Sequence, residues 1–187
     1  CIDNPAGGDL IGNAFWRGVG LADLLRAAGV RDGAVDVVFT ASDDYVDSVA
    51  IERAMMPGCM LAYEMNGMPL NSAHGAPLRL IVPGLFGLKN VKWIARIDVA
   101  ASDVRGYWQR RGWDDTAEYQ TMSRIDVATA GVVGQPATLA GVAFAGDRGV
   151  TRVEVSTDNG TTWREAELRP PLSTNAWALW HFAWVPQ

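Results

Sequence analysis

Apolar residues near the start of the chain recur at helical spacing. In the segment LADLLRAAGV, Leu21, Leu24, Leu25 and Ala28 fall on one face of a helix, and Gly29 supplies the left-handed residue that commonly ends one. The pattern therefore predicts a helix that ends before this glycine.

The pattern then changes to that of short strands. VDVVFTA is rich in β-branched residues and predicts a buried strand from about Val35 to Thr40, and residues 51–56 predict a short helical turn before Pro57. The runs MLAYEMNG, LRLIVPG and VKWIARIDVA are strand-like, with Gly, Pro and Asn between them. Asn66-Gly67 favours the positive φ angles of a tight hairpin turn. The first part of the chain is thus of the α+β class.

Periodicity fades over residues 102–124, which predict a long surface connection containing a domain boundary. Three strand-like stretches follow: PATLAGVAFAG, VTRVEVSTDNGTTWREAEL with a hairpin at residues 158–160, and AWALWHFAWVP. Short strands at this spacing are typical of a β-sandwich, but they are too few for a complete immunoglobulin-like one. We expect a first domain over residues 1–110 and a partial immunoglobulin-like sandwich over residues 120–187.

Composition narrows the class of protein. The 187 residues are 49% hydrophobic and carry a formal charge of −5, with acidic and basic residues intermixed. These values favour a folded globular chain and argue against nucleic acid as a partner. The apolar runs are broken by Pro and Gly long before the roughly 20 residues of a membrane crossing. Cys59 lies in an apolar run and is expected to be a buried free thiol.

Two groups of residues could carry chemistry. A thiolate at Cys1 is a soft donor suited to a metal, although an arbitrary terminal residue is the plainer interpretation. His74, Arg79 and Lys92 flank one short strand, and such a set suits a phosphate, because Arg offers parallel N–H donors and Lys a compact charge. The alternative is that His74 hydrogen-bonds within a turn and the two cations are solvated.

Aromatic residues allow further interpretations. YWQRRGW mixes aromatic and basic side chains, as base-stacking sites do, but it is a single cluster in an acidic chain. The tryptophans of AWALWHFAW could form a platform for sugars. Since Trp180, Phe182 and Trp184 alternate along one strand face, packing in a sandwich core is the favoured interpretation, with His181 at an edge.

Several motifs occur in an order that resembles one family. They are CIDN, NAFWRGVGLADLL, DDYVDSV, AYEMNGMPL, HGAPLR and VPGLFGLKNVKW. Together they resemble the sulfite oxidase family of molybdopterin-dependent oxidoreductases over nearly the whole chain, HGAPLR and VKW being the most specific. The chain looks like a bacterial member cut at both ends.

This resemblance implies a set of site residues. Cys1, followed at the motif's spacing by Asn4, would be the protein ligand to molybdenum. His74, Arg79 and Lys92 would hold the pterin and its terminal phosphate, with Asn90 nearby. Trp113 stands where the family delivers an aromatic residue to the substrate pocket. Four more residues match positions around the pocket in relatives but also have structural interpretations: Asn13, Trp16, Asp43 and Tyr45.

Two departures from the family affect the expected substrate. Sulfite oxidases place an Arg where this chain has Ala6, and usually a Tyr where it has Trp113. Without that cation, sulfite would lose a charge-assisted hydrogen bond of about 1.5–3 kcal/mol. The GGDLIGNA continuation is similar to sulfoxide-reductase-like and membrane-associated bacterial branches, which implies an extracytoplasmic or membrane-associated full-length protein.

The sequence thus predicts a molybdopterin cofactor and oxygen-atom transfer on a small-molecule substrate, but not by a sulfite oxidase proper. The implied partners are a haem- or quinone-linked electron-transfer protein and a second copy bound through the sandwich. The piece alone is expected to be inactive and to carry no cofactor. The rival hypothesis is a non-enzymatic binding or assembly module of the same fold.

Overall fold

The computed structural model describes residues 4–129 and 131–187, and it is mostly sheet with few helices. The chain forms two compact units. One comprises Ala14–Glu118, called here the first unit; the other, the second unit, comprises Tyr119–Gln187 together with the described part of residues 1–13. Each is described separately.

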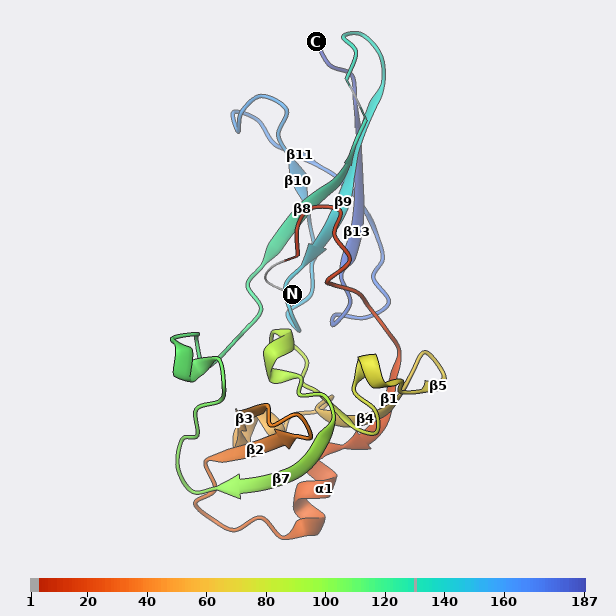
Figure 1. The fold of residues 1–187 in the computed structure, drawn as a ribbon. Coiled ribbons are helices and arrows are strands. Elements are labelled where there is room, and N and C mark those ends of the chain that lie inside the picture. Colours follow the sequence, from red (N-terminus) through yellow and green to blue (C-terminus); the bar gives the residue numbers. More distant parts are fainter. Residues whose placement is uncertain (1–3, 130) are drawn as a thin grey trace. The chain divides into compact units, whose positions relative to one another are not determined.

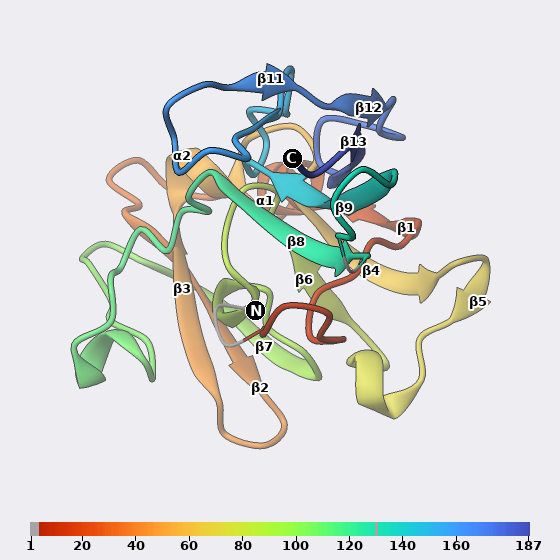
Figure 2. The ribbon, with the colours of Figure 1, turned by 90° about the horizontal axis from the view of Figure 1, so that it is seen from above.

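The first unit contains two antiparallel sheets. In one, β1 pairs with β4, and β4 also pairs with β5 and β6; in the other, β2 lies between β3 and β7 (Figure 1). Figure 2 shows β2 and β3 as adjacent arrows joined by a short turn. The strand bounds are Trp16–Gly20, Asp36–Ala41, Val46–Ala50, Met60–Met65, Met68–Pro69, Arg79–Ile81 and Ile94–Ala100 for β1 to β7. The hydrophobic pattern does not predict β1 and β3 as strands.

Helices in this unit are short. They are α1 (Leu21–Ala28), α2 (Ile51–Ala54) and the 3₁₀ turns η1 (Ser72–His74), η2 (Gly87–Lys89) and η3 (Gln109–Arg111). The predicted helix is confirmed, with Gly29 left-handed at φ 72°. Its predicted apolar face is wrong in part: Leu21 and Leu25 are buried, whereas Leu24 is 39% exposed. The first unit's core uses only one residue per turn of this helix.

The core of the first unit lies where α1 and the two sheets meet. Its buried side chains include Phe39, Leu80 and Val82, and Cys59 lies among them, buried as predicted. The Asn66-Gly67 hairpin is also confirmed, with both residues at positive φ and Met65 paired with Met68.

The second unit is built on one four-stranded antiparallel sheet in the order β12-β13-β9-β8, with β10 and β11 forming a separate hairpin (Figure 1). The bounds are Met122–Ala128, Ala137–Phe144, Glu154–Val155, Arg164–Glu165, Glu167–Arg169 and Ala178–Trp184 for β8 to β13. Strand β8 lies partly within the predicted connection, which therefore ends earlier than expected. The predicted turn at residues 158–160 lies within a longer loop, residues 156–163, between β10 and β11.

The alternation predicted for β13 is confirmed. Trp180 and Phe182 are 4% and 7% exposed and belong to the core, and Trp184 packs against it. His181 points the other way and pairs with Glu167 at 3.3 Å. Burial of Trp180 removes it from any sugar-binding platform. Within the described ranges, no helix combines the length and apolar character that a bilayer crossing requires.

Candidate functional site

His74 is held in a defined orientation by Asn71. The Asn71 side-chain oxygen caps η1 by accepting from the His74 backbone N–H at 2.9 Å, and it also accepts from His74 Nδ1 at 2.8 Å. Because an amide oxygen only accepts, Nδ1 carries a proton, and in the neutral ring Nε2 is left as an acceptor. The turn that the sequence allowed for His74 therefore presents one ring nitrogen to a ligand.

Gly75 brings the predicted phosphate-binding residues together. It adopts φ 106°, and a Cβ added there would lie 2.9 Å from Lys92 Cβ and 3.2 Å from Arg79 Cβ. The stems of Lys92 and Arg79 thus approach the same backbone atom, next to His74. A glycine is required here both by the backbone conformation and by the space that the two cationic stems occupy.

Arg79 is a half-buried cation with unused donors. Its Nη1 donates to the His74 carbonyl at 3.4 Å, and its guanidinium lies 5.1 Å from the ring centroid of Trp16. The buried Nε has no partner among the described residues. Burial lowers the pKa of Arg79 from its ordinary value. The group remains a cation, and an anionic ligand would satisfy its donor.

Lys92 is positioned by residues of the same turn. Its Nζ donates to the Ala73 carbonyl at 3.2 Å and lies 4.1 Å from the centroid of the Trp93 ring. Trp93 in turn donates from Nε1 to the Ser72 carbonyl at 2.6 Å. Within the VKW motif, Trp93 therefore hydrogen-bonds to η1 and its ring contacts the ammonium group of Lys92.

Asn90 has a clear structural role. Its Oδ1 accepts from the Val82 backbone N–H at 2.7 Å, while Nδ2 donates to the carbonyls of Leu85 and Phe86 at 3.3 and 3.1 Å. The amide thus shapes the VPGLF turn and has both N–H donors engaged. Its predicted contact with a cofactor stays a prediction.

Trp113 lies in an exposed aromatic cluster around η3. Its ring is 5.1 Å from that of Trp108, which is 5.2 Å from Tyr107, and Arg111 lies 3.5 Å above the Tyr107 ring. Trp113 is 38% exposed and follows the left-handed Gly112. The predicted role beside a substrate is untested, but the ring is accessible.

Sequence reasoning missed a buried charge cluster that Tyr45 connects to the ring of Tyr107. Lys89 is 3% exposed, and its Nζ lies 3.0 Å from Asp47 and 3.1 Å from Asp115. The Tyr45 hydroxyl lies 2.9 Å from Asp47 Oδ2, and burial, followed by the charge of Asp47, raises the pKa of Tyr45 above its usual range. Lys89 was overlooked because a lysine in a short turn is usually solvated.

The remaining predicted positions are divided between the units. In the first unit, Asp43 accepts from the Tyr45 backbone N–H at 3.2 Å within a turn. In the second unit, Asn4 accepts from the Leu10 N–H at 2.7 Å, and its buried Nδ2 has no partner among the described residues. Cys1 lies outside the described residues, so its predicted role stays a prediction.

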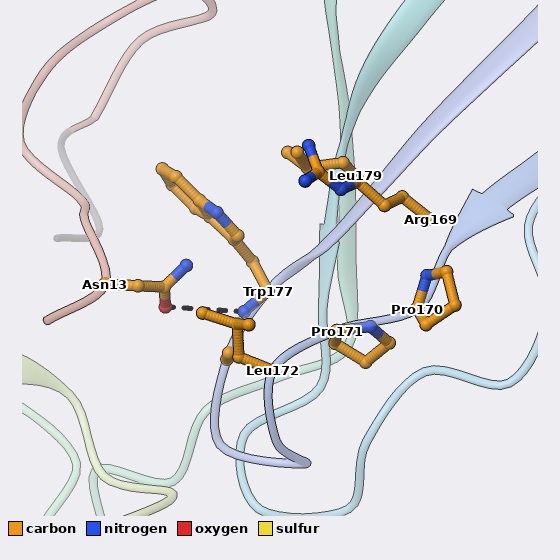
Figure 3. Close-up of a pocket in the computed structure, with 8 residues that line it drawn as sticks. Asn13, Arg169, Pro170, Pro171, Leu172, Trp177 and Leu179 are labelled. Carbon is orange, nitrogen blue, oxygen red and sulfur yellow. Dashed lines mark hydrogen bonds between the residues drawn. The ribbon is translucent and has the colours of Figure 1, made fainter. Parts of the chain in front are cut away.

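A cavity of about 230 Å³ lies in the second unit (Figure 3). Asn13 borders it and accepts from the Trp177 backbone N–H at 3.4 Å, which agrees with a structural role for Asn13. The other lining residues are Arg169, Pro170, Pro171, Leu172, Ala176 and Leu179. None of the residues predicted to bind the cofactor lines this cavity.

The donor set of the first unit fits a pterin that ends in a phosphate. Arg79 has an unpartnered buried N–H, Lys92 supplies a second cation at the same glycine, and His74 presents Nε2. Together, these three side chains offer the charge and the hydrogen bonds that such a group needs.

Comparison with known proteins identifies the family. Residues 1–108 match the oxidoreductase molybdopterin binding domain, and residues 115–186 match the Mo-co oxidoreductase dimerisation domain. Mitochondrial sulfite oxidase of Mus musculus is 36% identical over 212 residues, covering 94% of this chain and 39% of that protein. A nitrate reductase [NADH] of Brassica napus is 31% identical over 220 residues, covering 91% of this chain and 24% of that protein.

A solved structure agrees with this result. The sulfane dehydrogenase SoxCD from Paracoccus pantotrophus matches with a TM-score of 0.77 and 26% identity, over 94% of this chain and 49% of that one. The chain spans about two fifths of the length of the sulfite oxidases that it matches. The chain therefore belongs to the sulfite oxidase family of molybdopterin-dependent oxidoreductases.

Proposed function

We propose that the protein is a molybdenum-pterin oxidoreductase that transfers an oxygen atom between a small substrate and water, with Cys1 as the protein's ligand to molybdenum. The observation that carries this proposal is the meeting of His74, Arg79 and Lys92 at Gly75, where a buried guanidinium N–H lacks a partner. In a chain of this family, an unsatisfied cationic set of this kind suits the pterin and its phosphate.

Each of the three residues has a distinct role in this proposal. Arg79 and Lys92 bind the phosphate, Arg79 through its planar donors and Lys92 as a point charge. His74, fixed by Asn71, accepts a hydrogen bond from the pterin through Nε2. When bound, the cofactor supplies two-electron redox chemistry at molybdenum. Oxidation of a substrate with water releases two electrons and two protons, and reduction of a sulfoxide to a sulfide and water consumes the same number. A haem- or quinone-linked partner protein accepts or supplies the electrons.

The substrate of this reaction differs from that of sulfite oxidases proper. Ala6 brings no cation to the position where sulfite oxidases have an Arg, and Trp113 presents an indole where they usually have a Tyr hydroxyl. Both changes disfavour a small dianion and favour a larger or less charged substrate. A sulfoxide-like or organic sulfur compound fits this description.

The second unit is the candidate dimer contact. Residues 115–186 match a dimerisation domain, and its sheet with the β10-β11 hairpin around a Trp180-Phe182 core suits an immunoglobulin-like sandwich. We expect homodimers in solution, and light scattering coupled to size-exclusion chromatography measures the mass directly.

The function is tested by metal content. The protein, expressed from its complete reading frame in a host that makes the cofactor, should bind about one molybdenum per chain, and Cys1→Ser should lower that ratio sharply. Arg79→Gln should weaken cofactor retention by roughly 10- to 150-fold, since a hydrogen bond to a charged group contributes about 1.5–3 kcal/mol.

Arg96→Gln is the matched control, because Arg96 is an exposed cation of the same unit whose ion pair with Asp98 lies on β7. It should leave the molybdenum ratio unchanged. If the wild-type protein contains no molybdenum in a host whose own molybdoenzymes do contain it, the result would instead support the rival hypothesis of a non-enzymatic binding or assembly module.

A further inference from the structure

The segment that carries Trp113 is held at its end by a buried cation, Lys89, and at its start by Asp47, the partner of that cation. Lys89 Nζ contacts three acceptors: Asp47 at 3.0 Å, Asp115 at 3.1 Å and the Ser48 carbonyl at 2.9 Å. An ammonium group has three donors, so its hydrogen-bonding capacity is fully used. Lys89 Nζ therefore has no donor left for a ligand, and any role of Lys89 depends on the residues that it contacts.

Asp47 is the anchor at the start of this segment. A Cβ on Gly106 would lie 2.5 Å from Asp47 Oδ1, and the Tyr107 N–H donates to the Val46 carbonyl at 2.8 Å. The Tyr45 ring lies 5.9 Å from that of Tyr107, and its hydroxyl also reaches the Leu88 carbonyl at 2.9 Å. The beginning of the segment therefore packs directly on the strand that holds Lys89's first partner.

Asp115 is the anchor at the end of the segment. It pairs with Lys89 two residues after Trp113, and the next residues continue the contact, because Phe86 donates to the Ala117 carbonyl at 2.8 Å and Leu85 forms a bridge with Glu118. Residues 115–118 thus run along the turn that contains Lys89. Between the two anchors, Trp113 is held to Trp108 by a backbone hydrogen bond of 3.2 Å.

Lys89 also lies within the segment that carries the cofactor-binding candidates. Asn90 is its neighbour and fixes the preceding turn, and Lys92 lies three positions after Lys89. Lys89 is therefore a direct link between the loop assigned to the cofactor and the loop assigned to the substrate.

We infer that Lys89 is a positioning residue that sets the place of Trp113, and so of the substrate, relative to the loop that binds the cofactor. The inference rests on the proposed function for the roles of the two loops. The contacts of Lys89 do not depend on the proposed function, and their effect on Trp113 can be measured without cofactor or substrate.

The test uses the full chain labelled with fluorotryptophan and observed by fluorine NMR. Trp108→Phe and Trp113→Phe assign the two resonances. Lys89→Met removes the charge and keeps the length of the side chain, and it should shift or broaden both resonances while leaving Trp163 and Trp180 in the second unit unchanged. Lys89→Arg should restore them in part, and Arg96→Met is the control that should change nothing.

If Lys89→Met fails to fold, Asp115→Asn takes its place, since Asp115 is 37% exposed and its substitution removes only the second anchor. It should perturb Trp113 more than Trp108. A folded Lys89→Met or Asp115→Asn protein with unchanged Trp108 and Trp113 resonances would overturn the inference.

Molybdenum content separates this inference from the proposed function. In the wild-type protein, absence of molybdenum would refute the proposed function while the fluorine resonances still report on Lys89. In a molybdenum-loaded Lys89→Met protein, the KM for an organic sulfoxide should rise by about tenfold or more, because small displacements of positioning groups carry costs of this size. Unchanged KM with perturbed Trp113 would also count against the inference.

Discussion

Two cations of the first unit, the buried Lys89 and the half-buried Arg79, differ in how fully their donors are hydrogen-bonded. Lys89 has an acceptor for each of its three donors, whereas the buried Nε of Arg79 has none. A buried donor without a partner costs about 1–3 kcal/mol. Such a cost is tolerated where a ligand completes the hydrogen bonding, which agrees with the roles proposed for Arg79 in binding and for Lys89 in support.

At the same scale, Asp158 should show a low pKa that depends on one threonine. Its carboxylate accepts from the Thr162 hydroxyl at 2.6 Å and from the Thr162 N–H at 2.9 Å, and these bonds, together with one from Ser156, lower the pKa of Asp158 to about 2. A folded pKa below the unfolded value of about 3.9 means that the ionised form stabilises the fold above pH 4 or so, and that this stabilisation is lost as the pH falls towards 2.

NMR titration of the Asp158 carboxyl carbon measures this pKa directly. Thr162→Val removes the hydroxyl and should move the pKa up towards the unfolded value, while Thr157→Val, a change at a neighbour outside these hydrogen bonds, should not. A wild-type value near 3.9 would show that the loop does not hold the arrangement described here.

At the scale of elements, local signals were sufficient for some parts of the fold and not for others. Gly29 and the Asn66-Gly67 pair each end or reverse a segment through their own backbone preference, so α1 and the β4-β5 hairpin were predicted correctly. Strand β8 was missed because its alternation is inverted. Arg124 and Asp126 are the less exposed residues, at 12% and 20%, while Ile125 is 50% exposed.

The cause of that inversion lies far away in sequence. Arg124 donates to the Pro5 carbonyl at 3.2 Å, and Asp126 accepts from the Gly7 N–H at 2.8 Å. Residues 5–7 thus cover the polar side of β8, and no window of sequence around residue 124 contains this information.

The candidate site also depends on contacts between residues that are distant in the sequence. The residue types at 74, 79 and 92 were visible, but their meeting at Gly75 and the cluster around Lys89 depend on tertiary contacts.

One element-scale prediction concerns the close approach of β1 to β4. A Cβ on Gly18 would lie 2.2 Å from the Leu61 carbonyl oxygen, beside a register shift in the β1-β4 pairing. Gly18→Ala should therefore force the two strands apart, at a cost of about 1–3 kcal/mol and a fall in Tm of roughly 4 °C or more.

Thermal unfolding followed by far-ultraviolet circular dichroism tests this expectation. Gly87→Ala is the control, since a Cβ there would meet no atom within 4 Å. Equal Tm values for the two variants would mean that the sheet adjusts without strain and that the β1-β4 spacing is not fixed by this glycine.

At the scale of the whole molecule, charge and composition restrict the class of binding partner but not the arrangement of the charged residues. A net charge of −5 argues against a nucleic-acid partner but says nothing about which acidic residues are buried. Asp47 and Asp36 are both buried, at 1% and 6% exposure, and each accepts hydrogen bonds within the first unit. Part of the formal charge is therefore internal to the fold and is not presented to partners.

The division into two units leads to a prediction about autonomy. The core of the first unit, from Leu21 to Ile94, is made of its own residues, and the contacts of His74, Arg79, Lys92 and Lys89 named above are made within it. Because a unit that contains its own core and all three acceptors of its buried lysine needs no other part to fold, residues 14–118 expressed alone should fold cooperatively.

Dispersed amide resonances and a single denaturant transition would meet this expectation, and the Trp108 and Trp113 fluorine resonances should match those of the whole chain. Lys89→Met in the isolated unit should then reproduce the effect expected in the full chain, since every partner of Lys89 named above lies between residues 47 and 115. Poorly dispersed resonances from residues 14–118 would show instead that this core depends on residues of the second unit.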